Sequence, residues 1–334
     1  MSKCPAWLVP LKREVNFLFF RRYRYRRVVR RHLLKYYTES RPLSGLDDPA
    51  MVVAMSDGRL LHGGLADRLR SIASFYHFCK EDGRRFAIHF TWPFPLGEYL
   101  VPAEYDWRLK EGDLTYNSLQ AEPVYMDNTG DTGAREIEFE KATVAGFLQD
   151  RNRQYHVYSS FYWCEDSFAD DFRELFKPSD RMQALVEKEL ERLGGERRFV
   201  SVSARFLDLL GDFREPKPGR QLDDDERESL ITRCIDQLQS IHSQNPGTKV
   251  LVTSDSVTFL GRALQLDYVV SPEGTIAHVD TDVCSDHTKT FLDFLLIGKG
   301  YHAWQLRIGP MYGGNFSLRA AQAGNVPFTR LRIP

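Results

Sequence analysis

Apolar residues follow two spacings along the chain, short continuous runs and helical repeats, and the two alternate. Residues 51–55 form an apolar run typical of a buried strand, and a glycine turn follows at residues 62–64. Apolar positions then recur at helical spacing over residues 65–73, before a second apolar run at residues 84–90. This order predicts a β-α-β unit.

The alternation is clearest from Ser179 onward. Ser179 suits the N-cap of a helix that stops at Gly194 and Gly195, and Asp223 with Glu226 resembles a capping pair for a second helix. Strands are expected at residues 198–204, 249–253, 267–270 and 301–306, with further helices after residue 256, over residues 287–297 and after residue 317. Such a series predicts a parallel sheet with helices on both faces.

Two α/β series in one chain predict two Rossmann-like domains with parallel sheets that face each other across a cleft. We expect a basic segment at residues 1–45, a first domain at residues 46–178 and a second at residues 179–334. Residues 96–150 contain short possible strands and a loop rich in Gly, Asp and Thr near residues 127–133, but show no clear period.

In sheets of this kind ligands bind beyond the carboxyl ends of the strands. That rule selects three clusters in the second half, which are Arg205 with Asp208, residues 253–256, and residues 313–317. The guanidinium of Arg205 suits a bidentate grip on phosphate, although an ion pair with Asp208 or Asp212 explains it equally well.

The other two clusters also have a binding and a structural interpretation. Backbone N–H groups and the helix dipole favour phosphate at a helix start, here Gly314, Asn315, Phe316 and Ser317. A plain turn is the alternative. Asp255 and Ser256 suit hydrogen bonds to a ligand's sugar or base, or a cap on the next helix.

The glycine turn of the first half resembles a phosphate cradle. Gly63 and Gly64 allow backbone N–H groups to approach an anion, and Arg68 adds positive charge nearby. A tight turn that only lets strand and helix pack is the alternative interpretation.

Composition describes an ordinary globular protein of 334 residues, with 42% hydrophobic and 27% charged residues. The five cysteines include no CxxC pair and no histidine at metal-ligand spacing, so we predict neither a metal site nor a disulfide framework. No apolar run is long enough to span a membrane, and no signal peptide is evident. We therefore expect a cytoplasmic protein.

Positive charge is concentrated near the start of the chain. Residues 12–35 contain ten lysines and arginines against Glu14 alone, whereas the net charge of the chain is -1. The segment fits an amphipathic helix on an anionic membrane, a helix packed against the protein, or a nucleic-acid contact. Nucleic acid is the weakest of the three, because the remaining chain is acidic.

The motifs occur in a characteristic order, GGLADRLRSI, LFKPSDRMQ, FVSVSARFLD, VLVTSDS, KTFLDFLLIGKG and GGNFSLRAA. This order resembles the fucosyltransferase superfamily, which groups bacterial and plant α-1,2-, chitooligosaccharide and core α-1,6-fucosyltransferases with protein O-fucosyltransferases. The resemblance extends from Met51 to Ala321. It implies a GT-B fold, GDP-fucose as donor, an inverting reaction and no cofactor or required metal.

The resemblance also implies roles for single residues. The family's donor motif has a histidine, one residue, an arginine that holds the β-phosphate, and a Gly-Asp pair. Arg205 and Asp208 match it, whereas Ser203 replaces the histidine and Leu207 the glycine. The family's Ser-x-Phe-Ser phosphate motif resembles residues 314–317, and Asp67 matches an Asn or Asp that faces the cleft.

The chemistry of sugar transfer agrees with these roles. Negative charge develops on the leaving diphosphate, which Arg205 and the helix start near Gly314 would stabilise. A carboxylate is the usual base for the acceptor hydroxyl, and Asp208, Asp212 and Asp67 are the candidates.

The sequence therefore predicts an inverting, metal-independent glycosyltransferase that moves fucose from GDP-fucose to a glycan. A lipid-linked acceptor at the inner membrane surface would give the basic segment a purpose, and no nucleic-acid partner is expected. The alternative is a non-catalytic α/β protein that uses the basic segment to bind nucleic acid or a partner.

Overall fold

The computed structural model describes residues 21–38, 50–61, 63–127, 134–162, 166–212, 219–276 and 286–334. The chain divides into two compact units. Unit 1 comprises Met1–His62, Arg70–Thr91 and Asp106–Glu165, and unit 2 comprises Gly63–Leu69, Trp92–Tyr105 and Asp166–Pro334. The largest segment of unit 2 begins at Asp166, whereas the second domain was predicted to begin at residue 179, and unit 2 also includes the glycine turn and residues 92–105.

Unit 1 is built on a four-stranded parallel sheet with the order β2-β1-β5-β4. Its strands and helices are β1 (Val52–Ser56), β2 (Phe86–Phe90), β4 (Ala121–Met126), α4 (Ala134–Phe147) and β5 (Gln154–Ser159). Helix α3 (Leu65–Asp82) connects β1 to β2, with its first residues in unit 2. The β-α-β unit predicted for residues 51–90 is confirmed. Strand β4 and helix α4 lie where only short possible strands without a clear period were predicted, and β5 lies where no element was predicted.

The basic segment begins, within the described residues, with helix α2 (Arg21–Val28). It continues as a π-helical turn, Val29–Leu33, and a 3-10 turn, Leu34–Tyr36. Tyr25 is buried against β4 and donates a hydrogen bond to the carbonyl oxygen of Asp127 over 3.1 Å, and Leu33 is buried in the unit 1 core. For residues 21–38 these contacts support the interpretation of a helix packed against the protein. No helix of the described chain is long and apolar enough to cross a membrane.

Unit 2 contains a five-stranded parallel sheet with the order β11-β10-β7-β8-β9. The strands are β7 (Phe199–Ala204), β8 (Lys249–Ser254), β9 (Val269–Val270), β10 (His302–Ile308) and β11 (Phe328–Ile333). The helices are α5 (Phe168–Leu175), α6 (Asp180–Arg192), α7 (Asp224–Gln244), α8 (Val257–Ala263), α9 (Thr288–Ile297) and α10 (Phe316–Ala323), with 3-10 turns at Leu96–Glu98 and Leu207–Leu210. Strands β3 (Leu100–Pro102) and β6 (Phe176–Pro178) form a separate antiparallel pair.

The predicted α/β fold class with parallel sheets is confirmed. Ser179 caps α6 by accepting a hydrogen bond from the backbone N–H of Met182, and Asp223 with Glu226 forms a capping box on α7. Strand β11 was not predicted, because Arg330 and Arg332 interrupt its apolar pattern.

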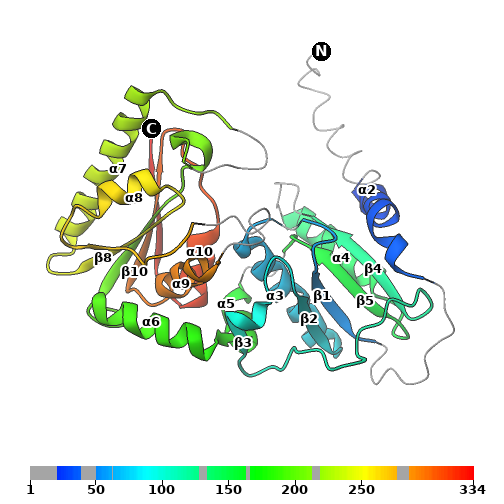
Figure 1. The fold of residues 1–334 in the computed structure, drawn as a ribbon. Coiled ribbons are helices and arrows are strands. Elements are labelled where there is room, and N and C mark those ends of the chain that lie inside the picture. The colour runs from blue at the N-terminus through cyan, green and yellow to red at the C-terminus, as the bar shows by residue number, and fades with distance from the viewer. Residues whose placement is uncertain are drawn as a thin grey trace, which may run out of the picture. The chain divides into compact units, whose positions relative to one another are not determined.

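The two faces of the unit 2 sheet differ in polarity. Val200, Val202, Leu306 and Ile308 point toward α7 and α8 and form the main hydrophobic core. Figure 1 shows α7 and α8 on one side of this sheet and α9 with α10 on the other. The second face includes buried polar side chains, Ser201, Thr253 and Gln305 among them.

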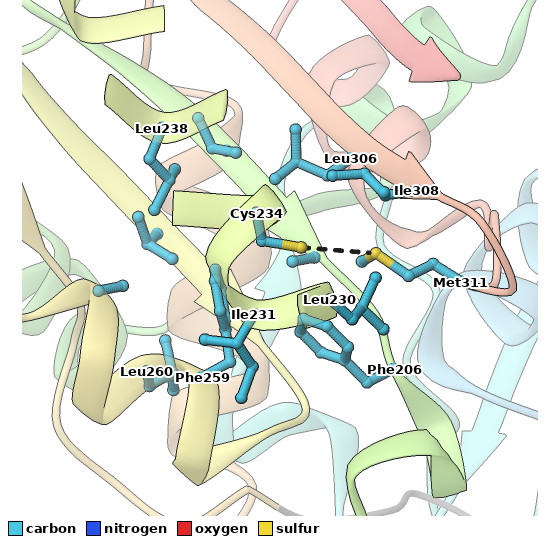
Figure 2. Close-up of a cluster of buried hydrophobic side chains, with 14 of the residues drawn as sticks. Phe206, Leu230, Ile231, Cys234, Leu238, Phe259, Leu260, Leu306, Ile308 and Met311 are labelled. Carbon is cyan, nitrogen blue, oxygen red and sulfur yellow. Dashed lines mark hydrogen bonds between the residues drawn. The ribbon is translucent and has the colours of Figure 1, made fainter. Parts of the chain in front are cut away.

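The core also anchors the loops that leave the sheet. Phe206 follows β7 and Met311 follows β10, and both are almost completely buried. Figure 2 shows Met311 facing Cys234 of α7, with 3.7 Å between the two sulfur atoms. Because these anchors are fixed, the adjacent residues Arg205 and Tyr312 leave the sheet from defined positions.

Candidate functional site

A cavity lies within unit 2 at the carboxyl ends of β7, β8 and β10, where ligands bind in parallel α/β sheets. All of its lining residues belong to this unit. They are Gly64, Leu65, Ser203, Ala204, Arg205, Thr253, Ser254, Asp255, Thr275, Ile276, Lys289, Thr290, Asp293, Gln305, Gly314, Phe316 and Ser317.

The floor of the cavity is the polar face of the sheet. Ser203, Thr253 and Gln305 lie on adjacent strands and point to this face. The hydroxyl oxygens of Ser203 and Thr253 are 2.8 Å apart, and Gln305 donates a hydrogen bond to the carbonyl oxygen of Gly314 over 2.8 Å. The sheet therefore presents hydroxyl and amide groups where the opposite face presents valine and leucine.

Arg205 is the first residue after β7, and its side chain is 35% exposed. Its Nε lies 3.7 Å from Oδ2 of Asp255, and its guanidinium carbon lies 5.6 Å from the centre of the Tyr312 ring. Asp255 accepts hydrogen bonds from the backbone N–H groups of Phe206 and Leu207 over 2.8 and 2.9 Å. Asp255 thereby fixes the loop that carries Arg205.

Burial raises the pKa of Asp255, while the charge of Arg205 and the donated N–H groups lower it. The two carboxylate oxygens already accept two backbone hydrogen bonds. We therefore interpret Asp255 mainly as a support for Arg205, although it also lines the cavity.

The start of α10 forms another wall. Gly314, Phe316 and Ser317 line the cavity, whereas Asn315 occupies the N-cap position without a side-chain capping bond. Ser317 is only 1% exposed, and its hydroxyl has no hydrogen-bond partner in the described chain. A buried hydroxyl without a partner is costly, so it marks a position where a ligand acceptor or donor would be stabilised.

Gly314 lies close to two neighbouring side chains. A Cβ atom there would lie 3.1 Å from the Tyr312 ring and 3.8 Å from Cδ of Arg205. The close approach of these three residues gathers the helix start, the arginine and the aromatic ring at one side of the cavity.

An ion pair within α9 was not predicted as part of the site. Lys289 donates a hydrogen bond to each carboxylate oxygen of Asp293, both at a distance of 3.0 Å, and both side chains are buried in the cavity wall. Burial raises the pKa of Asp293 to about 6, although Lys289 opposes this shift. The i, i+4 spacing of two charges in a very apolar helix is the sequence signal that could have identified the pair.

The glycine turn contributes through its backbone. Gly64 lines the cavity, and Gly63 has a φ of +77°, which glycine adopts without strain. Arg68 is buried, and donates hydrogen bonds to the carbonyl oxygens of Gly63 and Trp92, both over 3.0 Å. Arg68 thus braces the turn, and Asp67 lies on the first turn of α3, outside the lining residues.

Asp208 and Ser256 lie beside the cavity and do not line it. Asp208 is buried and accepts a hydrogen bond from the backbone N–H of Gly219 over 2.8 Å. Ser256 caps α8 and donates a hydrogen bond to Asp212 over 2.8 Å. In the structure both predicted site residues therefore have contacts that hold loops and helix ends.

No group of three or more metal-binding side chains is assembled among the described residues. What the cavity does offer is one partly exposed guanidinium, the start of a helix, a buried hydroxyl and a polar floor. These groups suit an anionic ligand with hydrogen-bonding groups attached to it.

Several solved structures have a fold similar to that of this chain. No protein-family model matches the sequence, and no curated protein matches it. Among solved structures, a mutant of Arabidopsis thaliana FUT1 in complex with GDP matches with a TM-score of 0.54 and 15% identity, covering 100% of this chain and 81% of that chain.

The fucosyltransferase NodZ from Bradyrhizobium is also similar, with a TM-score of 0.51 and 14% identity over 81% of this chain and 91% of that chain. A structure of NodZ, an alpha-1,6-fucosyltransferase, soaked with GDP-fucose gives a TM-score of 0.52 at 13% identity, covering 82% of this chain and 92% of that chain. The chain thus has the fold of these fucosyltransferases, and the resemblance read from its motifs is confirmed at the level of the fold.

Proposed function

We propose that this protein is a glycosyltransferase that binds the nucleotide diphosphate part of a sugar donor in the unit 2 cavity. The observation that carries the proposal is the meeting of three features in one cavity, namely Arg205, the start of α10 and the buried hydroxyl of Ser317, which has no partner in the part of the chain that the structure describes. The fold adds support, because the similar solved structures are fucosyltransferases.

GDP-fucose is the donor that we propose first. Structures similar to this one contain GDP or were soaked with GDP-fucose. Their identity to this chain is only 13 to 15%, so the donor rests on the fold and on the cavity chemistry together.

In the proposed reaction an acceptor hydroxyl forms a bond to the sugar carbon while the bond between the sugar and the diphosphate breaks, and the hydroxyl proton passes to a carboxylate base. Negative charge then grows on the leaving phosphate, and Arg205 stabilises it by charge and hydrogen bonding. The first N–H groups of α10 act on the same charge through the helix dipole. We propose a metal-independent, inverting transfer to a glycan on this basis.

The base of the proposed reaction is a carboxylate, and Asp208, Asp212 and Asp67 are the candidates from the sequence. Asp208 accepts a backbone hydrogen bond, and Asp212 accepts hydrogen bonds from the Ser256 hydroxyl and the Thr258 N–H. Asp67 lies in the first turn of α3, the helix that begins beside Gly64.

Binding of GDP to this protein tests the proposed function directly. We expect GDP and GDP-fucose to raise the melting temperature of the protein, since a ligand at a hundredfold excess over its dissociation constant stabilises by about 2.7 kcal/mol. Arg205→Ala should weaken GDP binding by about tenfold or more in calorimetry, because a charge-assisted hydrogen bond is lost.

Arg262→Ala is the matched control, because Arg262 is an exposed arginine of unit 2 that pairs with Glu228 away from the cavity lining. It should leave GDP binding unchanged. Unaltered GDP affinity in Arg205→Ala would remove Arg205 from its role, and the absence of any nucleotide binding would contradict the proposed function.

A further inference from the structure

Three arginines project from one face of the unit 2 sheet at its edge. Arg307 of β10 and Arg332 of β11 are register partners on adjacent parallel strands, and Arg330 is the register partner of Gln305. Side chains two residues apart on a strand share a face, so all three arginines lie on the face of Gln305, which lines the cavity. Leu331 and Ile333, which alternate with them, pack into the hydrophobic core on the opposite face.

The local contacts hold this cluster in place without neutralising it. Arg330 donates hydrogen bonds to the side-chain oxygen of Gln305 and to the carbonyl oxygen of Gly314, the latter over 3.2 Å. Gly313 gives Arg307 its space, since a Cβ at that position would lie 3.2 Å from the Arg307 Cδ. The two groups that accept hydrogen bonds from Arg330, the side-chain oxygen of Gln305 and the carbonyl oxygen of Gly314, are both neutral.

No acidic side chain of the described residues pairs with any of the three arginines. Burial lowers the pKa of Arg330, the charges of Arg332 and Arg307 lower it further, and Tyr312 opposes the shift. Three like charges on adjacent strands repel one another. A bound anion would remove this repulsion, and the planar guanidinium fork matches the oxygens of a phosphate group.

We propose that Arg307, Arg330 and Arg332 form a second anion-binding site, outside the cavity, that takes a phosphate or diphosphate ester carried by the acceptor. The assignment to the acceptor rests on the proposed transferase function, whereas the anion site itself does not. The two sites adjoin at Gly314, which lines the cavity while its carbonyl oxygen accepts a hydrogen bond from Arg330, a residue outside the lining.

We expect a phosphate ester to bind at the three arginines while GDP occupies the cavity. In calorimetry, inorganic pyrophosphate and glucose 1-phosphate should bind to the full chain saturated with GDP, and added salt should weaken both. Arg307→Gln/Arg332→Gln should reduce both affinities about tenfold or more, because two charged contacts are lost, and should leave GDP affinity unchanged.

The matched control is Arg220→Gln/Arg262→Gln, which removes two exposed arginines of unit 2 that pair with Glu226 and Glu228. It should not change the binding of either phosphate. Equal losses of phosphate affinity in the two double variants would mean that binding depends only on the net charge of the protein, and would contradict the proposed site.

Two further outcomes would contradict the proposal. Absence of pyrophosphate binding to the protein saturated with GDP would place both anions in a single site. Binding of pyrophosphate without binding of glucose 1-phosphate would exclude a sugar-linked phosphate as the occupant. If GDP fails to bind but the arginine-dependent phosphate binding persists, the anion site stands and the donor proposal falls.

Discussion

Ser317 lies in the first turn of α10 with its hydroxyl buried in the cavity wall and without a hydrogen-bond partner among the described residues. Ser317→Ala should therefore leave the melting temperature of the free protein unchanged or slightly higher, because no hydrogen bond is lost on mutation. GDP affinity should fall about five- to tenfold, as expected for one hydrogen bond of about 1 kcal/mol.

Ser201→Ala is a close control for this prediction. Ser201 is also buried, and its hydroxyl has no partner within the described part of the chain, yet it does not line the cavity. Its replacement should leave both the melting temperature and GDP affinity nearly unchanged. An equal loss of GDP affinity in the two variants would show that Ser317 acts on packing and not on the ligand.

The Lys289–Asp293 pair makes a second prediction at the scale of single residues. Asp293→Leu leaves the Lys289 ammonium buried without its partner, which costs roughly 3–5 kcal/mol of unfolding free energy. The double variant Lys289→Met/Asp293→Leu removes both charges and should be more stable than the single variant in urea unfolding. A double variant less stable than Asp293→Leu would show that the ion pair itself is not the cause.

The same carboxyl group predicts a pH dependence. Burial raises the pKa of Asp293 to about 6 in the folded state, from an unfolded value of about 4. Between these values the folded state binds more protons than the unfolded state, so the contribution of Asp293 to stability falls as pH rises from about 4 to 6. Urea unfolding over this range should show a decline that is absent from the double variant.

At the scale of elements, the turn after β7 places Leu207 at a φ of +54°, where the related motif has glycine. A side chain in the left-handed region costs roughly 1–2 kcal/mol. Leu207→Gly should therefore unfold at a higher urea concentration than Leu207→Ala, since both variants lose the leucine side chain and only alanine keeps the strain. Equal midpoints would show that the turn carries no strain at this residue.

Strand β5 was not predicted because its apolar pattern is interrupted by polar residues that are nevertheless buried. All six residues of β5 are buried, although the strand includes Gln154 and His156. His156 is bonded to the hydroxyl of Tyr37 and to Gln154, and Gln154 accepts from the backbone N–H of Thr115. Polar residues become buried when distant partners satisfy them, and hydrophobic periodicity does not reveal such partners.

At the scale of the whole molecule, every residue that lines the cavity belongs to unit 2. GDP should therefore slow amide hydrogen exchange at the end of β7, in α9 and at the start of α10, and leave the β4 and β5 strands of unit 1 unchanged. Hydrogen exchange read by mass spectrometry with and without GDP measures this difference. Equal protection of the unit 1 strands would contradict a site confined to unit 2.

The sequence by itself determined the α/β class, the helix ends at Ser179 and Asp223, and the positions of Arg205 and Gly314 beyond the strands. These features follow from local spacing, capping and the rule that ligands bind at the carboxyl ends of parallel strands.

The tertiary structure alone decided which of the candidates meet. In the structure Gly64, from the first half of the chain, lines the same cavity as Arg205. The side chains of Arg68 and Ser256, which were predicted to bind the donor, instead form hydrogen bonds that support a turn and a helix end. The tertiary structure also brought Lys289 and Asp293 into the cavity wall and aligned Arg307 with Arg332. Such groupings depend on strand order and register between distant segments, which neither composition nor local spacing contains.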